Sequence, residues 1–173
     1  MSIHLPHVDL PPKKFRKQIN SERKFGFEDS SHDIRDSVIA AMDWSIHKVI
    51  DELKKQELYD NSVVLVTTDN GGGPNYSNAP LKGTKETVYE GGIRGVSFLL
   101  SPLLKRSGYK YSGLIHLSDW VPTLARLAGV PISTDLDGQD LWDSLSNNLS
   151  SPRTHIFHNI DQDKDKGTWQ VKI

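Results

Sequence analysis

The feature that most constrains the fold is a long helix-periodic segment followed by a short apolar run. Between Asp33 and Glu57, apolar side chains recur at steps of three and four residues, which places them on one face of a helix. Ser62–Thr67 is rich in β-branched residues without alternation, as expected for a strand buried on both faces. A helix leading into a buried strand is half of a βαβ unit. The sequence therefore predicts an α/β fold with a mostly parallel sheet flanked by helices. The periodic positions are Ile34, Val38, Ile39, Met42, Ile46, Val49, Ile50 and Leu53.

Shorter elements are expected in the rest of the chain. Val96–Leu100 predicts a second buried strand, and Ser118 is placed to cap a helix over Asp119–Leu127. Gly129 follows the expected end of that helix, as glycine commonly does. The remaining expected elements are a helical turn or two over Asp140–Leu145 and strands over His155–His158 and Trp169–Ile173.

Composition excludes several classes of function. The chain has 21 basic and 22 acidic residues and a formal charge of −1, so no global field favours nucleic acid or a membrane surface. Its longest apolar runs are too short to span a bilayer, and its first residues lack the charged and apolar regions of a signal peptide. The absence of cysteine excludes disulfides, thiolate metal sites and a cysteine-derived nucleophile within this chain.

Asp69 and Asn70 directly follow the first predicted strand. Ligands of open parallel sheets bind outside the carboxyl ends of strands, and side-chain oxygens are the donors that calcium prefers. Gly71–Gly73 would allow positive φ angles and a close approach of backbone to a ligand. A plain Asn-Gly turn explains the same residues, and two donors fill only part of a calcium shell of about six to eight. A metal site and an ordinary turn therefore both stay open.

Two cationic side chains are candidates for anion binding. Lys85 lies in a loop rich in glycine, where its ammonium group could offset charge on a sulfuryl or phosphoryl oxygen. Lys82, three residues earlier, is the comparison for an ordinary surface lysine. His4 could bind an anion or donate a proton to a departing alkoxide, although histidines near a terminus are usually spectators.

Other polar residues are expected to have structural roles. Arg94 is expected to pair with Glu90 or Asp119. His116 and His158 lie in or beside predicted strands and are interpreted as hydrogen-bonded core histidines.

Two sequons for N-linked glycans are present, at Asn75 and Asn148. Asn75 adjoins the glycine-rich segment, where a bulky glycan would crowd the expected site. Asn148, in a polar turn, is therefore the better candidate.

Together, six stretches of the chain resemble the sulfatase family, and within it the arylsulfatase B type. They occur in the family's order and cover nearly the whole chain. The resemblance implies an α/β fold of the alkaline-phosphatase-like type, of which this chain would be a part. The stretches are Ser2–Pro6, Thr68–Gly71, Pro80–Lys85, Glu90–Gly95, His116–Leu124, and Leu136–Asp140 followed by His158–Asp161.

The resemblance also implies a chemistry. It makes Asp69 and Asn70 ligands of one calcium ion, and Lys85 and His4 contacts to the sulfate. It implies a sulfated saccharide, such as a sulfated N-acetylgalactosamine in a glycosaminoglycan, or an aryl sulfate as substrate. By the same resemblance, the protein would be lysosomal or secreted.

Part of the family pattern does not occur in this sequence. Family members carry paired calcium-binding aspartates and a cysteine motif, converted to the formylglycine nucleophile, in an N-terminal half. We therefore expect residues 1–173 to be a partial sulfatase catalytic domain that is inactive alone, with the other calcium ligands in that missing half. Two alternatives stay open: a short non-catalytic binding or interaction protein, and a phosphate-ester hydrolase of the same superfamily.

Overall fold

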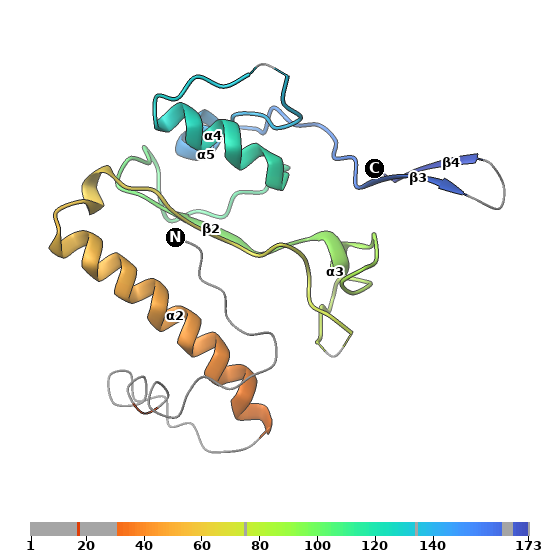
Figure 1. Cartoon of the computed structure of the whole chain (residues 1–173), viewed down its shortest axis with the longest axis horizontal. Helices are drawn as coiled ribbons and strands as arrows, with labels where there is room; N and C mark the ends of the chain where they lie inside the picture. Colours follow the sequence, from red (N-terminus) through yellow and green to blue (C-terminus); the bar gives the residue numbers. More distant parts are fainter. Residues whose placement is uncertain (1–16, 18–30, 75, 134, 164–167, 173) are drawn as a thin grey trace. The chain divides into compact units, whose positions relative to one another are not determined.

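The computed structural model describes residue 17 and residues 31–74, 76–133, 135–163 and 168–172. The chain divides into two compact units, Met1–Asp60 and Asn61–Ile173. Figure 1 labels the helices and strands that are discussed below. None of the helices in the described ranges is long and apolar enough to cross a membrane.

The described part of the first unit is dominated by helix α2, Ser31–Lys55. The predicted helix is confirmed, with ends two residues from those expected. Ala40 and Ala41 are buried, and Trp44 packs against them. Ile39, predicted to lie on the apolar face, is exposed. Lysines occupy the last turn, where a positive charge interacts favourably with the helix dipole. The short 3₁₀ helix η1, Tyr59–Asn61, follows.

The second unit contains a two-stranded sheet. Strand β1, Val64–Thr67, pairs with β2, Ser97–Leu100, in an antiparallel ladder that places Val64 opposite Leu100. The sequence predicted a mostly parallel sheet, and this expectation does not hold for these two strands. Parallel neighbours need a crossover of a dozen or more residues, usually a helix. Between β1 and β2 the described residues form only α3, Glu90–Ile93, so the chain folds back on itself.

One face of this sheet carries the core of the unit. Leu65 and Leu99 are cross-strand partners, and both pack against a buried cluster of Trp120, Leu141 and Leu145. Trp120 belongs to helix α4, Trp120–Leu127, and Leu145 to helix α5, Trp142–Asn147, while Leu141 directly precedes α5. Both helices lie beside the strands in Figure 1. Alternate residues of a strand point to opposite faces. Phe98 and Leu100 are accordingly exposed, so β2 is not buried on both faces as predicted. In β1 the first three residues are half-buried and Thr67 is exposed.

The turn before α4 differs from the prediction. The 3₁₀ helix η2, Leu117–Asp119, begins after His116, whose ring nitrogen Nδ1 accepts a hydrogen bond from the backbone N–H of Ser118. The Asp119 carboxylate in turn accepts from the His116 N–H at 2.7 Å. His116 therefore caps η2, and the predicted cap of α4 by Ser118 is wrong, because the N-cap of α4 is Asp119, without a side-chain capping bond. Gly129, with a φ of +66°, ends α4 as predicted.

Asp119 also anchors the segment after α5. Its side chain is fully buried and accepts hydrogen bonds from Arg153 Nε at 3.0 Å and from Arg153 Nη2. The Gln139 N–H donates to the same carboxylate at 2.8 Å. The Asp119 carboxylate therefore joins its own turn to the segments of Gln139 and Arg153.

Arg94 pairs with Glu90, one of its two expected partners, at 3.4 Å on the surface.

The chain ends in an antiparallel hairpin of β3, Asn159–Asp163, and β4, Thr168–Lys172, in which Asn159 lies opposite Lys172. β4 corresponds to the predicted last strand. The other late strand begins just after the predicted range, and His158 is exposed. The interpretation of His158 as a core histidine is therefore wrong, whereas His116 is half-buried and hydrogen-bonded.

Candidate functional site

Three segments between β1 and β2 pack closely together, and we call residues 69–73, 78–85 and 90–95 the site loops, although the last of them includes the short helix α3. The Gly71 N–H donates to the Gly92 carbonyl at 2.9 Å, and the Lys85 N–H donates to the Gly72 carbonyl at 2.9 Å. A third bond runs from the Gly91 N–H to the Lys82 carbonyl at 2.8 Å. The structure thus brings the segment of Asp69 and Asn70 against the segment of Lys85.

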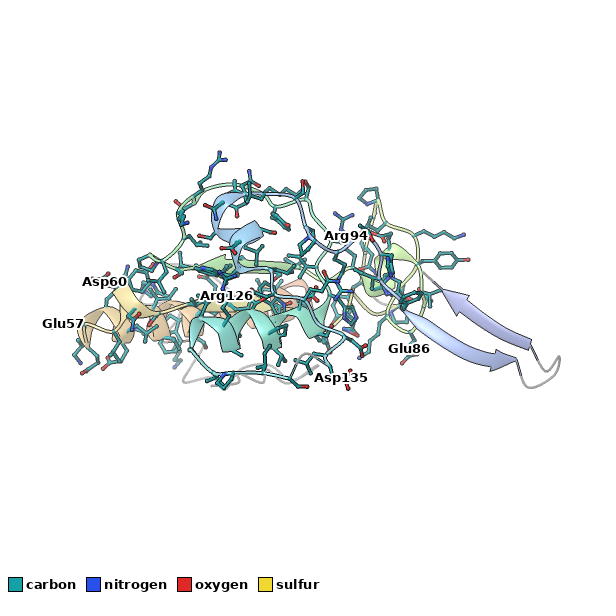
Figure 2. All side chains as sticks on the ribbon, turned by 90° about the horizontal axis from the view of Figure 1, so that it is seen from above. Glu57, Asp60, Glu86, Arg94, Arg126 and Asp135 are labelled. Atoms are coloured by element: carbon teal, nitrogen blue, oxygen red, sulfur yellow. The ribbon has the colours of Figure 1, made fainter. Side chains whose placement is uncertain are left out.

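Glycine is needed where these backbones touch. A Cβ atom at Gly71 would lie 1.9 Å from the Gly91 carbonyl oxygen, and one at Gly91 would lie 2.3 Å from the Gly83 oxygen. Real Cβ atoms do not approach a backbone oxygen so closely, so these positions exclude a side chain. Close approach was one of the two predicted roles of the glycine run. Positive φ is not found at Gly71; within the site loops it occurs at Gly83, at +90°, and at Glu86 just after them. Figure 2 labels Glu86 and Arg94 in this region.

Asp69 and Asn70 lie side by side just past β1. The Asn70 amide Nδ2 donates to Asp69 Oδ1 at 2.5 Å, with Asp69 exposed and Asn70 half-buried. Among the described residues, no hydrogen bond engages Asp69 Oδ2 or Asn70 Oδ1. These are hard oxygen donors of the kind that calcium prefers. No group of three or more His, Cys, Asp or Glu side chains suited to a metal occurs in the described part of the chain. The pair therefore fits part of a calcium site and needs further ligands.

The two lysines of the site loops differ in their surroundings. Lys82 Nζ lies 4.3 Å from the ring centroid of Tyr89, in a cation–π contact on the surface. Lys85 is half-buried, and its ammonium group makes no ion pair or ring contact with the residues that the structure describes. Lys85 is thus the cation with capacity for an anionic ligand, while Lys82 already has a partner.

The other candidate residues are distributed differently. His4 and Asn75 lie outside the described residues. Asn148 is exposed and follows α5 in the left-handed conformation, with a φ of +56°. It lies on a surface turn, as the sequence predicted.

One residue of the site loops was missed in the sequence. The Asn78 side chain accepts from the Gly72 N–H at 2.8 Å and donates to the carbonyls of Gly72 at 2.9 Å and Gly83 at 3.1 Å. A single asparagine in a polar loop gives no signal by itself. Only the folded loops show that this amide bridges two of them.

The sequence model of the family described as Sulfatase matches residues 1–130. This chain belongs to the sulfatase family. Arylsulfatase J of Mus musculus is 45% identical over 140 residues, covering 77% of this chain and 23% of the relative. Steryl-sulfatase of Homo sapiens is 30% identical over 145 residues, covering 75% of this chain and 24% of the relative. This sulfatase chain therefore spans about a quarter of the length of these relatives.

Solved structures agree with this family. Ps i-CgsB, crystallised with k-i-k-neocarrahexaose, aligns with a TM-score of 0.70 and 27% identity over 85% of this sulfatase chain and 33% of its own. BT4656, solved with its substrate D-Glucosamine-2-N, 6-O-disulfate, has the same fold, with a TM-score of 0.58 and 20% identity. The alignment covers 90% of this chain and 33% of BT4656. The predicted class, an α/β part of the alkaline-phosphatase-like sulfatase fold, is confirmed.

Proposed function

We propose that this chain forms part of the catalytic site of a calcium-dependent sulfuric ester hydrolase of the arylsulfatase B type. The observation that carries the proposal is the bond from the Lys85 N–H to the Gly72 carbonyl. This bond attaches the backbone of the half-buried Lys85 to the loop that begins with Asp69 and Asn70. The chain that contains both loops belongs to the sulfatase family. A cation and oxygen donors on two loops that are bonded to each other suit a sulfate ester and a hard metal ion together.

Each residue has a proposed role. Asp69 and Asn70 hold one calcium ion, which when bound acts as a Lewis acid toward a sulfuryl oxygen. The Lys85 ammonium group offsets negative charge on the sulfate and on the oxygen that leaves. His4 contacts the sulfate near that oxygen and donates a proton to it. Further calcium ligands and the nucleophile come from residues that this sequence does not contain.

The proposed substrates are sulfated glycosaminoglycans of the N-acetylgalactosamine 4-sulfate type, or aryl sulfates. The name of the relative that is 45% identical, Arylsulfatase J, supports an aryl sulfate as a test substrate. The saccharide complex of Ps i-CgsB supports a sugar as the natural one. A lysosomal or secreted location follows from the same proposal.

The 173-residue chain alone is expected to have no sulfatase activity, because it contains no cysteine from which the nucleophile could form. The assay measures hydrolysis of an aryl sulfate by this chain and by its Lys85→Ala variant. Equal rates, both at the background of the buffer, are expected. Turnover by the unaltered chain above that of the variant would show that a nucleophile lies within these residues.

The calcium proposal is tested in a longer sulfatase polypeptide that includes these residues. Asp69→Ala removes a charged ligand, so the calcium concentration for half-maximal activity is expected to rise by about tenfold or more. Asp135→Ala, which removes an exposed carboxylate from the loop after α4, is the matched control (Figure 2). The same calcium dependence in both variants would refute the assignment.

We also propose that Asn148 carries an N-linked glycan. Its side chain is exposed at the end of α5, within the triplet Asn148-Leu149-Ser150. Expression in a secretory host is expected to give a band that an endoglycosidase shifts, and Asn148→Gln is expected to remove one glycan. Asn147→Gln should leave the band unchanged. An unaltered glycan mass in Asn148→Gln would exclude this site.

A further inference from the structure

Asn78 connects two of the site loops through a single side chain. Its Oδ1 accepts from the Gly72 N–H, and its Nδ2 donates to the Gly72 carbonyl, so one amide satisfies both backbone groups of residue 72. The same Nδ2 donates to the Gly83 carbonyl at 3.1 Å. The side-chain amide thus makes the two hydrogen bonds to Gly72 that the backbone of a neighbouring β-strand would make.

Gly72 is the residue at which this connection reaches the site. Its carbonyl oxygen accepts from two donors, Asn78 Nδ2 at 2.9 Å and the Lys85 N–H at 2.9 Å. A Cβ atom at Gly72 would lie 2.7 Å from Asn78 Oδ1, so the glycine leaves the space that the amide needs. Gly72 is only two residues from Asn70. The amide of Asn78 therefore fixes the point where the Lys85 backbone meets the segment of Asp69 and Asn70.

We propose that Asn78 is a positioning residue that holds the Lys85 ammonium group in place relative to Asp69 and Asn70. The inference rests on the proposed function of Lys85 as a sulfate contact. Asn78 is given no contact with the substrate. Its effect on hydrolysis passes through the Gly72 carbonyl and the Lys85 backbone, and this distinguishes it from a residue that only stabilises the fold.

Asn78→Asp tests the bridge with little change in shape. The aspartate keeps an acceptor for the Gly72 N–H but loses both donors and turns a carboxylate oxygen toward the carbonyls of Gly72 and Gly83. Asn78→Ala, which removes all three bonds, is the second variant. Asn147→Ala is the matched control, because it removes one hydrogen bond between an asparagine amide and a backbone carbonyl (2.9 Å, to Asp143) in α5.

The first readout is amide hydrogen exchange in the 173-residue chain. Protection of the Lys85 N–H is expected to fall by about tenfold in both Asn78 variants, since several hydrogen bonds are lost together. Protection of the Leu145 N–H in α5 should stay unchanged. Unchanged protection at Lys85, or an equal loss at Leu145, would overturn the proposal, because the amide would then have no local effect on this loop.

The second readout is a double-mutant cycle on kcat/KM for an aryl sulfate, measured in a longer sulfatase polypeptide that contains these residues. Asn78→Asp is expected to lower kcat/KM by about tenfold or more, because small misplacements of a catalytic group are costly. In the Lys85→Ala background, Asn78→Asp should lower kcat/KM by less than about twofold, since the ammonium group through which Asn78 acts is absent.

The outcomes separate this inference from the function on which it rests. If Lys85→Ala lowers kcat/KM and Asn78→Asp lowers it by the same factor in both backgrounds, the positioning role is refuted and the proposed function stands. If Lys85→Ala leaves kcat/KM unchanged, both are refuted. Coupled losses, with Asn147→Ala at the rate of the unaltered enzyme, confirm the positioning role.

Discussion

Removing the buried carboxylate of Asp119 is expected to be among the most destabilising single changes in the second unit. The side chain is fully buried, and Arg153, its charged partner, is only 12% exposed. Arg153 Nη2 also donates to the Asp137 carbonyl at 3.0 Å. Asp119→Ala would leave the largely buried guanidinium group of Arg153 without its counter-ion, and would leave the N–H groups of His116 and Gln139 without an acceptor.

The size of the effect follows from these contacts. Breaking a buried ion pair by removing one partner costs about 3–5 kcal/mol. Arg153 keeps some access to water, so we expect a loss of about 3 kcal/mol, at the lower end of that range. For a unit of this size, such a loss lowers the melting temperature by roughly 10 °C or more.

The pH dependence of this effect has a definite sign. Burial raises the pKa of the Asp119 carboxyl, but the hydrogen bonds from Arg153, Gln139 and His116 outweigh it, so the pKa lies below its usual range. A carboxyl with a lowered folded-state pKa stabilises the protein above its unfolded pKa of about 3.9. That contribution is lost as the pH falls through the folded-state pKa. The stability difference between the unaltered chain and Asp119→Ala is therefore expected to narrow below about pH 4.

Urea unfolding, followed by circular dichroism at pH 7 and at a series of lower pH values, measures the loss of unfolding free energy and its pH dependence. Arg126→Ala is the matched control. Like Arg153, Arg126 is ion-paired, with Asp140 at 2.8 Å and Asp143 at 2.9 Å, but these pairs lie on the exposed surface. This variant is expected to shift the midpoint little. A similar small shift for Asp119→Ala, or a difference that stays constant down to pH 3, would refute the reasoning.

Two further changes test the packing of the second unit. Gly71→Ala places a Cβ atom 1.9 Å from the Gly91 carbonyl oxygen, so it should force the site loops apart and destabilise the unit by about 1–3 kcal/mol in urea unfolding; an unchanged midpoint would contradict the close approach. Tyr111 has a buried hydroxyl group with no hydrogen-bond partner among the described residues. Tyr111→Phe should therefore leave stability equal or raise it, because no bond is lost and a desolvated polar group is removed; a clear loss would show a hidden partner.

Local sequence signals predicted α2, α4 and α5, but not the short helix α3. The three- and four-residue spacing of apolar residues located α2 to within two residues at each end, and Gly129, after the C-cap Ala128, marked the end of α4. The direction of strand pairing was not predictable in the same way. A helix before β1 suggested a βαβ unit, but pairing depends on what lies between β1 and β2, and that segment forms loops around the short α3.

The candidate site was predicted in part. Asp69, Asn70 and Lys85 were identified from residue type and position in the chain, and the structure places their segments in contact. Asn78 and the Asp119–Arg153 pair were not found. Both depend on contacts between side chains and distant segments, across 34 residues in the case of the ion pair. Residue type alone does not determine which of several partners a polar side chain meets, as the two expected partners of Arg94 illustrate.

The central claim is that Lys85, and not the neighbouring Lys82, belongs to a sulfatase catalytic site. The most direct measurement compares Lys85→Ala with Lys82→Ala in a longer sulfatase polypeptide that includes these residues, by kcat/KM for an aryl sulfate. Loss of one charge-stabilising donor typically lowers the rate by about a hundredfold or more, so kcat/KM of Lys85→Ala is expected to fall by that factor. Lys82→Ala, which loses only a surface contact with Tyr89, should stay within about twofold. Equal rates for the two variants would contradict the account.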